Sequence, residues 1–169
     1  NEDLITATKL NVELKDSDSN IEKIVDIGFV GEPKSLNKNI LEDFIKKDHI
    51  PVISPLGKDE ENFTYNINAD TVAGFVAGKL KASKLLLLTD VPGIFNEEKK
   101  LISSLTLKEA IEISGMDYIS GGMKPKIQTC IDAMEKGVSK STILDGRIPH
   151  SVILELFTEH GIGTQISNN

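Results

Sequence analysis

The chain has 169 residues, and its 26 acidic and 19 basic side chains give a formal net charge of −7. Hydrophobic residues at 39% and charged residues at 27% suit one globular domain and exclude a disordered chain. The acidic balance without basic clusters argues against nucleic acid or an anionic membrane as partner, because phosphate binding needs concentrated lysine and arginine. No apolar run approaches the roughly 20 residues of a membrane-spanning helix. The single cysteine, Cys130, excludes an internal disulfide and a thiolate zinc cage, so a cytoplasmic location is expected.

The first third of the chain mixes polar turns with short apolar runs. Residues 23–30 combine β-branched side chains with partial alternation, which predicts a strand, and Gly31-Glu32-Pro33 predicts a turn after it. Residues 39–47 have apolar side chains at helical spacing, with acids early and lysines late, as a helix dipole favours. Residues 50–54 (IPVIS) then predict a short buried strand.

From residue 66 onward, helical and strand patterns alternate. The apolar run at 85–89 (LLLLT) predicts a central parallel strand that is covered on both faces. Further strands are predicted at 142–144 and 163–166, and helices at about 69–82, 106–114, 121–136 and 149–157. Thr106 can cap the second of these helices. Because strands separated by such helices need crossover connections, the sequence predicts an α/β fold with a mostly parallel sheet.

Ligands of such sheets bind outside the carboxyl ends of the strands, so the strand-to-helix junctions are the first candidates for a site. The first junction is Asn66-Ile67-Asn68-Ala69-Asp70. Asn68 can cap the following helix, and Asp70 in its first turn suits the positive helix end. The same carboxamides and carboxylate can instead hold a substrate carboxylate and orient catalytic ammonium groups, and both interpretations stay open.

The second junction, Thr89-Asp90-Val91-Pro92-Gly93-Ile94, follows the leucine strand. Asp90 at this position can bind a nucleotide or a metal. A turn-forming aspartate before Val-Pro-Gly is an equally good interpretation.

The third junction is Ser120-Gly121-Gly122-Met123-Lys124-Pro125-Lys126. Two glycines before a helix let backbone amides approach a phosphate, and Lys126 lies about one turn into that helix. The pattern is neither GxxxxGK[ST] nor GxGxxG, which excludes the ordinary P-loop and dinucleotide motifs. Taken alone, the motif is better interpreted as a glycine turn followed by a surface lysine.

The remaining candidates are weaker. His49, His150 and His160 lack metal-ligand spacing, so no protein metal site is predicted. Cys130 lies within a helical pattern and is interpreted as a buried, inert thiol.

Five segments in register resemble the acetylglutamate kinases, a group within the amino-acid kinase family: NINAD at 66–70, LLLLTDVPGI at 85–94, ISGGMKPK at 119–126, ILDGRIPHS at 143–151 and ELFTEHGIGT at 155–164. The resemblance implies a three-layer α/β sandwich with a mainly parallel central sheet. It makes residues 1–169 a single partial domain, with 1–65 the end of the amino-acid-substrate lobe and 66–169 mainly the nucleotide-binding lobe.

The resemblance also implies the reaction and the site residues. Members of the group phosphorylate the γ-carboxylate of N-acetyl-L-glutamate with ATP and Mg²⁺, in arginine biosynthesis. By this match Lys126 stabilises charge on the transferring phosphoryl group, Asp70 orients the catalytic lysines and Asn66 binds the amino-acid substrate. The residues implied to lie along ATP are Thr89, Asp90, Val91, Gly122 and Met123.

Family members begin with a glycine-rich loop that supplies a second catalytic lysine, and this motif is missing from the first third of the chain. The chain opens on Asn1 rather than on methionine. We therefore expect it to be the carboxyl-terminal part of a kinase of twice the size, to have negligible activity alone, and to form a homo-oligomer when full length.

Arginine-inhibited members have their effector site near the carboxyl terminus, which implies Glu155 and Gly161 as arginine-binding residues. A carboxylate is a suitable partner for a guanidinium. Thr142 stands where such members often have histidine, which affects the detail of inhibition.

Two alternatives to this hypothesis stay open. One is an amino-acid kinase with a different acid substrate. The other is a non-catalytic module that binds arginine or a nucleotide, against which Lys126 and Asp70 argue because a pure sensor needs neither.

Overall fold

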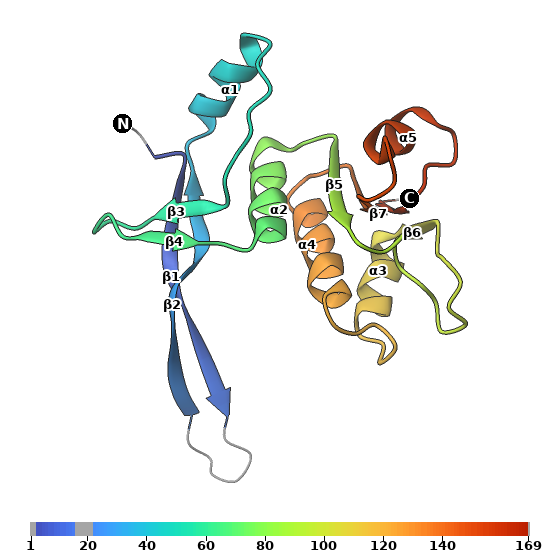
Figure 1. Cartoon of the computed structure of the whole chain (residues 1–169), viewed down its shortest axis with the longest axis horizontal. Coiled ribbons are helices and arrows are strands. Elements are labelled where there is room, and N and C mark those ends of the chain that lie inside the picture. The colour runs from blue at the N-terminus through green and yellow to red at the C-terminus, as the bar shows by residue number, and fades with distance from the viewer. Residues whose placement is uncertain (1–2, 16–21, 169) are drawn as a thin grey trace. The chain divides into compact units, whose positions relative to one another are not determined.

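The computed structural model describes residues 3–15 and 22–168, and the chain divides into two compact units, 1–72 and 73–169 (Figure 1). The first unit contains β1 (Ile5–Lys15), β2 (Glu22–Leu36), α1 (Lys38–Lys46), β3 (Leu56–Lys58), β4 (Thr64–Asn66) and the start of α2 (Ala69–Leu80). The second contains β5 (Lys84–Thr89), β6 (Ser104–Thr106), α3 (Leu107–Ser114), α4 (Met123–Glu135), β7 (Lys140–Asp145), α5 (Ser151–Phe157) and β8 (Thr164–Ser167). Within the described ranges, no helix combines the length and the apolar composition that crossing a bilayer requires.

The first unit is a small closed barrel with the strand order β1-β2-β4-β3. Strands β1 and β2 are antiparallel and continue past β3 and β4 as a two-stranded ribbon (Figure 1). Ile5, Tyr65 and Ile67 are buried in this unit, as is Leu41 of α1. A side chain at Gly31 would place its Cβ 2.7 Å from Tyr65 Cβ, so glycine lets β2 pass close to β4.

Two predictions for the first third of the chain were wrong. Gly31-Glu32-Pro33 is not a turn but part of β2, where Glu32 pairs with Thr8 of β1. Residues 50–54 form no strand, and Ile50 and Val52 are 91% and 96% exposed. A short apolar run becomes a strand only if a partner strand offers hydrogen bonds. In this region Leu56–Lys58 pairs with β4 instead.

The second unit is built on a mixed sheet with the strand order β5-β7-β8-β6. The pairs β5–β7 and β6–β8 are parallel, whereas β7–β8 is antiparallel. Helices α3 and α4 lie side by side (Figure 1) and share a core with Leu87, Ile143 and Ile166. Thr142 alternates with Ile143 along β7 and donates a 3.1 Å hydrogen bond to Glu155 of α5, so α5 lies on the opposite face. The predicted α/β class is confirmed.

All five predicted helices are present, as are the strands predicted at 85–89, 142–144 and 163–166, with small shifts of their ends. The predicted caps are confirmed as well. Asn68 accepts hydrogen bonds from the amides of Asp70 (2.9 Å) and Thr71 (3.2 Å), and Thr106 forms a capping box with Glu109. Strands β1, β3, β4 and β6 were not predicted.

Candidate functional site

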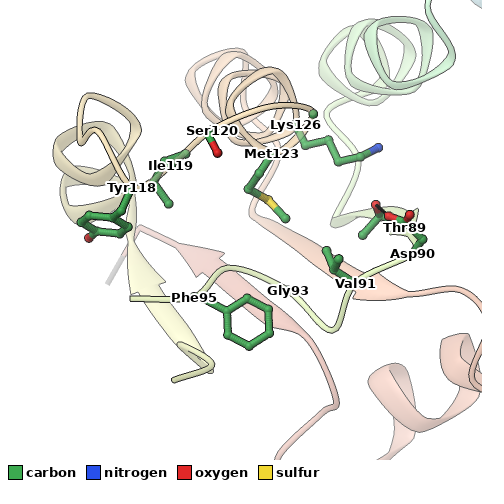
Figure 2. Close-up of a pocket in the computed structure, with 11 residues that line it drawn as sticks. Thr89, Asp90, Val91, Gly93, Phe95, Tyr118, Ile119, Ser120, Met123 and Lys126 are labelled. Atoms are coloured by element: carbon green, nitrogen blue, oxygen red, sulfur yellow. Dashed lines mark hydrogen bonds between the residues drawn. The ribbon is translucent and has the colours of Figure 1, made fainter. Parts of the chain in front are cut away.

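A cavity of about 360 Å³ lies in the second unit, at the carboxyl end of β5 (Figure 2). Its walls come from the turn after β5, the loop before α4 and the first turn of α4. The structure brings together here six residues that the sequence analysis selected: Thr89, Asp90, Val91, Gly122, Met123 and Lys126. The second and third predicted junctions, about 30 residues apart in the sequence, thus form one cavity, as expected for loops at one edge of a sheet.

The turn after β5 forms one wall of the cavity and packs against Thr164 of β8. Thr89 is the last residue of the strand, and Gly93 and Phe95 continue the wall. A Cβ at Gly93 would lie within van der Waals overlap of Thr164 Oγ1, so only glycine allows the turn to approach β8 this closely.

The amino-terminal end of α4 forms the opposite wall. Gly121 has a φ of +59°. Chain neighbours apart, no heavy atom of the residues that the structure describes lies within 4 Å of a Cβ built on Gly121 or Gly122. Among residues 123–126, all of which the structure describes, none is acidic. First-turn amides have no partner within the helix and favour an anion, so this open helix end suits a phosphate.

The cavity has one polar end and one apolar end. In Figure 2 the amine of Lys126 points toward Thr89 and Asp90, while the rings of Phe95 and Tyr118 lie at the other end. Met123 projects toward Val91 between them. A ligand with a flat apolar part and an anionic part, such as a nucleotide, matches this division.

A bidentate ion pair lies beside the polar end, where Asp145 ends β7 and Arg147 follows it. Asp145 pairs with Thr89 across the sheet, and the Gly146 amide donates to the Thr89 carbonyl at 2.9 Å. The Arg147 guanidinium contacts the buried Asp145 carboxylate through Nε (3.0 Å) and Nη2 (2.8 Å). These hydrogen bonds, with a further one from the Arg147 amide, hold the pKa of Asp145 below its usual range. Asp145 and, more weakly, Asp90 raise the pKa of Arg147, so this cation offsets negative charge at the cavity edge.

The other two predicted catalytic or substrate residues belong to the first unit. Asn66 is the exposed last residue of β4, and Asp70 is half-buried in the first turn of α2. Their roles remain predictions. The cap that Asn68 provides to α2 is a structural reason for an asparagine at this position of the NINAD segment.

Comparison with known proteins identifies the family. The model described as "Amino acid kinase family" matches residues 1–145. The chain belongs to the amino acid kinase family.

Relatives and solved structures agree with this assignment. The acetylglutamate kinase of Brucella canis is 50% identical over 163 residues, which cover 96% of this chain and 55% of the relative. That of Parvibaculum lavamentivorans is 52% identical, with 96% and 54% covered. The chain therefore spans about half the length of these relatives. The N-acetylglutamate synthase from Neisseria gonorrhoeae, in a structure with coenzyme A and L-arginine, superposes with a TM-score of 0.85 at 27% identity, over 98% of this chain and 37% of that one.

Five cavity residues were not among the predicted site residues: Gly93, Phe95, Tyr118, Ile119 and Ser120. Three of them lie inside the family segments at 85–94 and 119–126. Phe95 and Tyr118 each lie one residue outside these segments, so only the folded structure reveals that both aromatic rings face one cavity.

Within residues 3–15 and 22–168, no group of three histidine, cysteine or carboxylate side chains is arranged to hold a metal ion. Magnesium keeps several waters and commonly uses one or two carboxylates together with substrate phosphates. Asp90, at the polar end of the cavity, is a suitable single carboxylate for this kind of binding.

The two residues predicted to bind arginine, Glu155 and Gly161, lie together in the second unit. The buried Glu155 carboxylate accepts hydrogen bonds from the amides of Ile162 (2.9 Å) and Gly163 (3.3 Å) and from Thr142 Oγ1. A Cβ at Gly161 would lie 2.5 Å from Glu155 Oε2. The carboxylate thus anchors the loop between α5 and β8.

Proposed function

We propose that this chain is the nucleotide-binding part of an acetylglutamate kinase, which transfers a phosphoryl group from ATP to the γ-carboxylate of N-acetyl-L-glutamate. The convergence of the turn after β5 and the start of α4 on one cavity supports the proposal most strongly. The 50% identity to acetylglutamate kinases over 163 residues supports the choice of substrate.

Phosphoryl transfer needs positioning and electrostatic stabilisation more than covalent chemistry by the protein. The Lys126 ammonium stabilises the negative charge that develops on the transferring phosphoryl group, and the first-turn amides of α4 bind neighbouring phosphate oxygens. Phe95, Tyr118 and Met123 provide an apolar surface for the base. Two features support the fit to ATP: the open amino-terminal end of α4 and the separation of the cavity into a polar and an apolar end.

The acid substrate and the orientation of the lysines are assigned to the NINAD segment. Asn66 binds N-acetyl-L-glutamate through its carboxamide, and Asp70 orients the catalytic ammonium groups. A general base is unnecessary because the attacking carboxylate is already ionised at neutral pH. Mg²⁺, when bound with the nucleotide, neutralises phosphate charge, and Asp90 would hold it.

The test uses a chimera in which this chain replaces its matching stretch of the Brucella canis acetylglutamate kinase. We expect ADP release that depends on N-acetyl-L-glutamate and not on aspartate, glutamate or carbamate. Lys126→Ala should lower kcat by about 100-fold or more, as loss of a transition-state charge partner does. Lys124→Ala is the matched control, because exposed Lys124 does not line the cavity.

A chimera that binds ATP but phosphorylates another acid would favour a different amino-acid kinase, and one that binds ATP without any turnover would favour a non-catalytic module. The chain alone should show negligible turnover. Turnover of the chain alone at the rate of the relatives would contradict that expectation.

We further propose that arginine binds at Glu155 and inhibits the whole enzyme, with Gly161 beside it. A carboxylate has about four acceptor sites, and three donors already occupy Glu155, so a guanidinium would make a single hydrogen bond rather than a fork. From the family resemblance we also propose a cytoplasmic homo-oligomer, with residues 1–65 in the amino-acid-substrate lobe and 66–169 mainly in the nucleotide lobe.

A further inference from the structure

Thr164, the first residue of β8, is completely buried and carries a hydroxyl that makes two hydrogen bonds. Its Oγ1 donates to the carbonyl of Ile102 at 2.6 Å and accepts from the amide of Ile94 at 2.8 Å. A hydroxyl has one proton, so the bond to Ile102 directs a lone pair at Ile94. The side chain thereby joins two backbone groups that lie far from it in the sequence.

These two backbone groups belong to the first and last residues of one loop, residues 94–102. The amide of Ile102 donates to the carbonyl of Ile94 at 2.8 Å, and Phe95 forms a β-bridge with Leu101. The Thr164 hydroxyl therefore closes the base of the 94–102 loop from outside. The same loop supplies Phe95 to the cavity, and Gly93 immediately precedes it.

Gly93 in the cavity wall packs so closely against Thr164 that no side chain fits between them. A Cβ on Gly93 would lie 3.0 Å from the Thr164 amide nitrogen and still closer to its hydroxyl oxygen. On its other side, Thr164 follows the loop that the Glu155 carboxylate anchors through the amides of Ile162 and Gly163. The hydroxyl thus joins β8, which is paired on both sides with β6 and β7, to the cavity wall at the Ile94 amide.

We propose that Thr164 is a positioning residue for the cavity, whose hydroxyl fixes Gly93 and Phe95 in the geometry that binds the ligand. The identity of that ligand as a nucleotide rests on the proposed function. Loss of the hydroxyl leaves the buried Ile94 amide without an acceptor, and the wall must move for this amide to find one. Valine has nearly the shape of threonine but cannot accept this bond, whereas serine can.

The test is a fluorescence titration of the chain with mant-ADP in the presence of Mg²⁺, combined with hydrogen exchange of the Ile94 amide. Thr164→Val should weaken mant-ADP binding about tenfold and accelerate exchange at Ile94, while Thr164→Ser stays within about threefold of the parent. Ile166→Val is the matched control, because it removes a buried methyl group from the same strand and Ile166 does not line the cavity. This control should leave the affinity for mant-ADP unchanged.

The proposal is overturned if Thr164→Val binds mant-ADP as tightly as the parent, or if Ile166→Val weakens binding to the same extent. Should Thr164→Val fail to fold, Thr164→Cys carries the same expectation, because sulfur is a weak acceptor. If the parent chain does not bind mant-ADP, the proposed function fails. The exchange measurement then still decides the role of Thr164: protection of Ile94 that persists in the valine variant overturns it.

Discussion

Asp145 and Arg147 show how two side chains set the charge at the carboxyl end of the β5–β7 pair. Arg147 is the only arginine in the sequence, and its Nε and Nη2 each donate a hydrogen bond to Asp145. The carboxylate is buried and the guanidinium is largely exposed, so the cation is available at the edge of the cavity while its anchor is fixed. This geometry explains why the pKa of Asp145 is lowered.

The pair makes stability depend on pH in a defined direction. Because the folded-state pKa of Asp145 lies below its ordinary value of 3.8, its contribution is present above that value and is lost as the pH falls through the folded-state pKa. Arg147→Gln should therefore lower the free energy of unfolding at neutral pH, and the difference from the parent should shrink in acid. Urea unfolding at about pH 6 and about pH 3 measures this.

Lys100→Gln removes the same charge from an exposed pair with Glu98 and is the control, with no comparable pH-dependent loss expected. An Arg147→Gln variant whose difference from the parent stays constant across these pH values would contradict the assignment.

At the residue scale, the sequence was sufficient wherever the interaction is local. Asn68 and Thr106 cap their helices through amides two or three residues away, so the pattern alone predicts both. Thr164 differs because its partner Ile94 is 70 residues away. No local pattern could reveal that contact.

The loop between α5 and β8 shows the same dependence on distant partners at the scale of an element. Helix α5 is short, and Glu155 in its interior supports the following loop rather than the helix itself. Its carboxylate faces amides on one side and, on the other, the Thr142 hydroxyl, with Lys84 Nζ at 3.9 Å.

Glu155→Gln should destabilise the second unit, because its donors reach both carboxylate oxygens, whereas a carboxamide has one acceptor oxygen and no charge to pair with Lys84. Leaving one such buried group unpaired costs about 1–3 kcal/mol. Urea unfolding measures the change, and faster hydrogen exchange at Ile162 and Gly163 locates it. Glu112→Gln, at an exposed position of α3, serves as the control. Equal stability of the two variants would show that Glu155 does not anchor the loop.

Among the elements, the helices were predicted well because helical spacing and caps depend on residues that are close together in the sequence. Strands were predicted where a continuous apolar run marks a buried strand, as in β5. The short strands β4 and β6 gave no such pattern, and residues 50–54 gave the pattern without the pairing. Strand formation depends on partners elsewhere in the chain, which periodicity does not encode.

At the scale of the whole chain, each unit contributes a different part of the proposed chemistry. The barrel unit carries Asn66 and Asp70, and the sheet unit carries the cavity with Lys126. The order of five family segments predicted the α/β class and six cavity residues. The mixed strand order and the division at residue 72 depend on which distant segments contact one another, so they were accessible only from the structure.

The central claim is that the cavity of the second unit binds a nucleotide through the turn after β5 and the start of α4. Titration of the isotopically labelled chain with MgADP, followed by amide chemical shifts, tests it most directly. We predict saturable shifts concentrated at residues 89–95 and 118–126, and much weaker binding by Lys126→Ala than by Lys124→Ala. The absence of saturable shifts at millimolar MgADP, or their concentration outside these two segments, would contradict the claim.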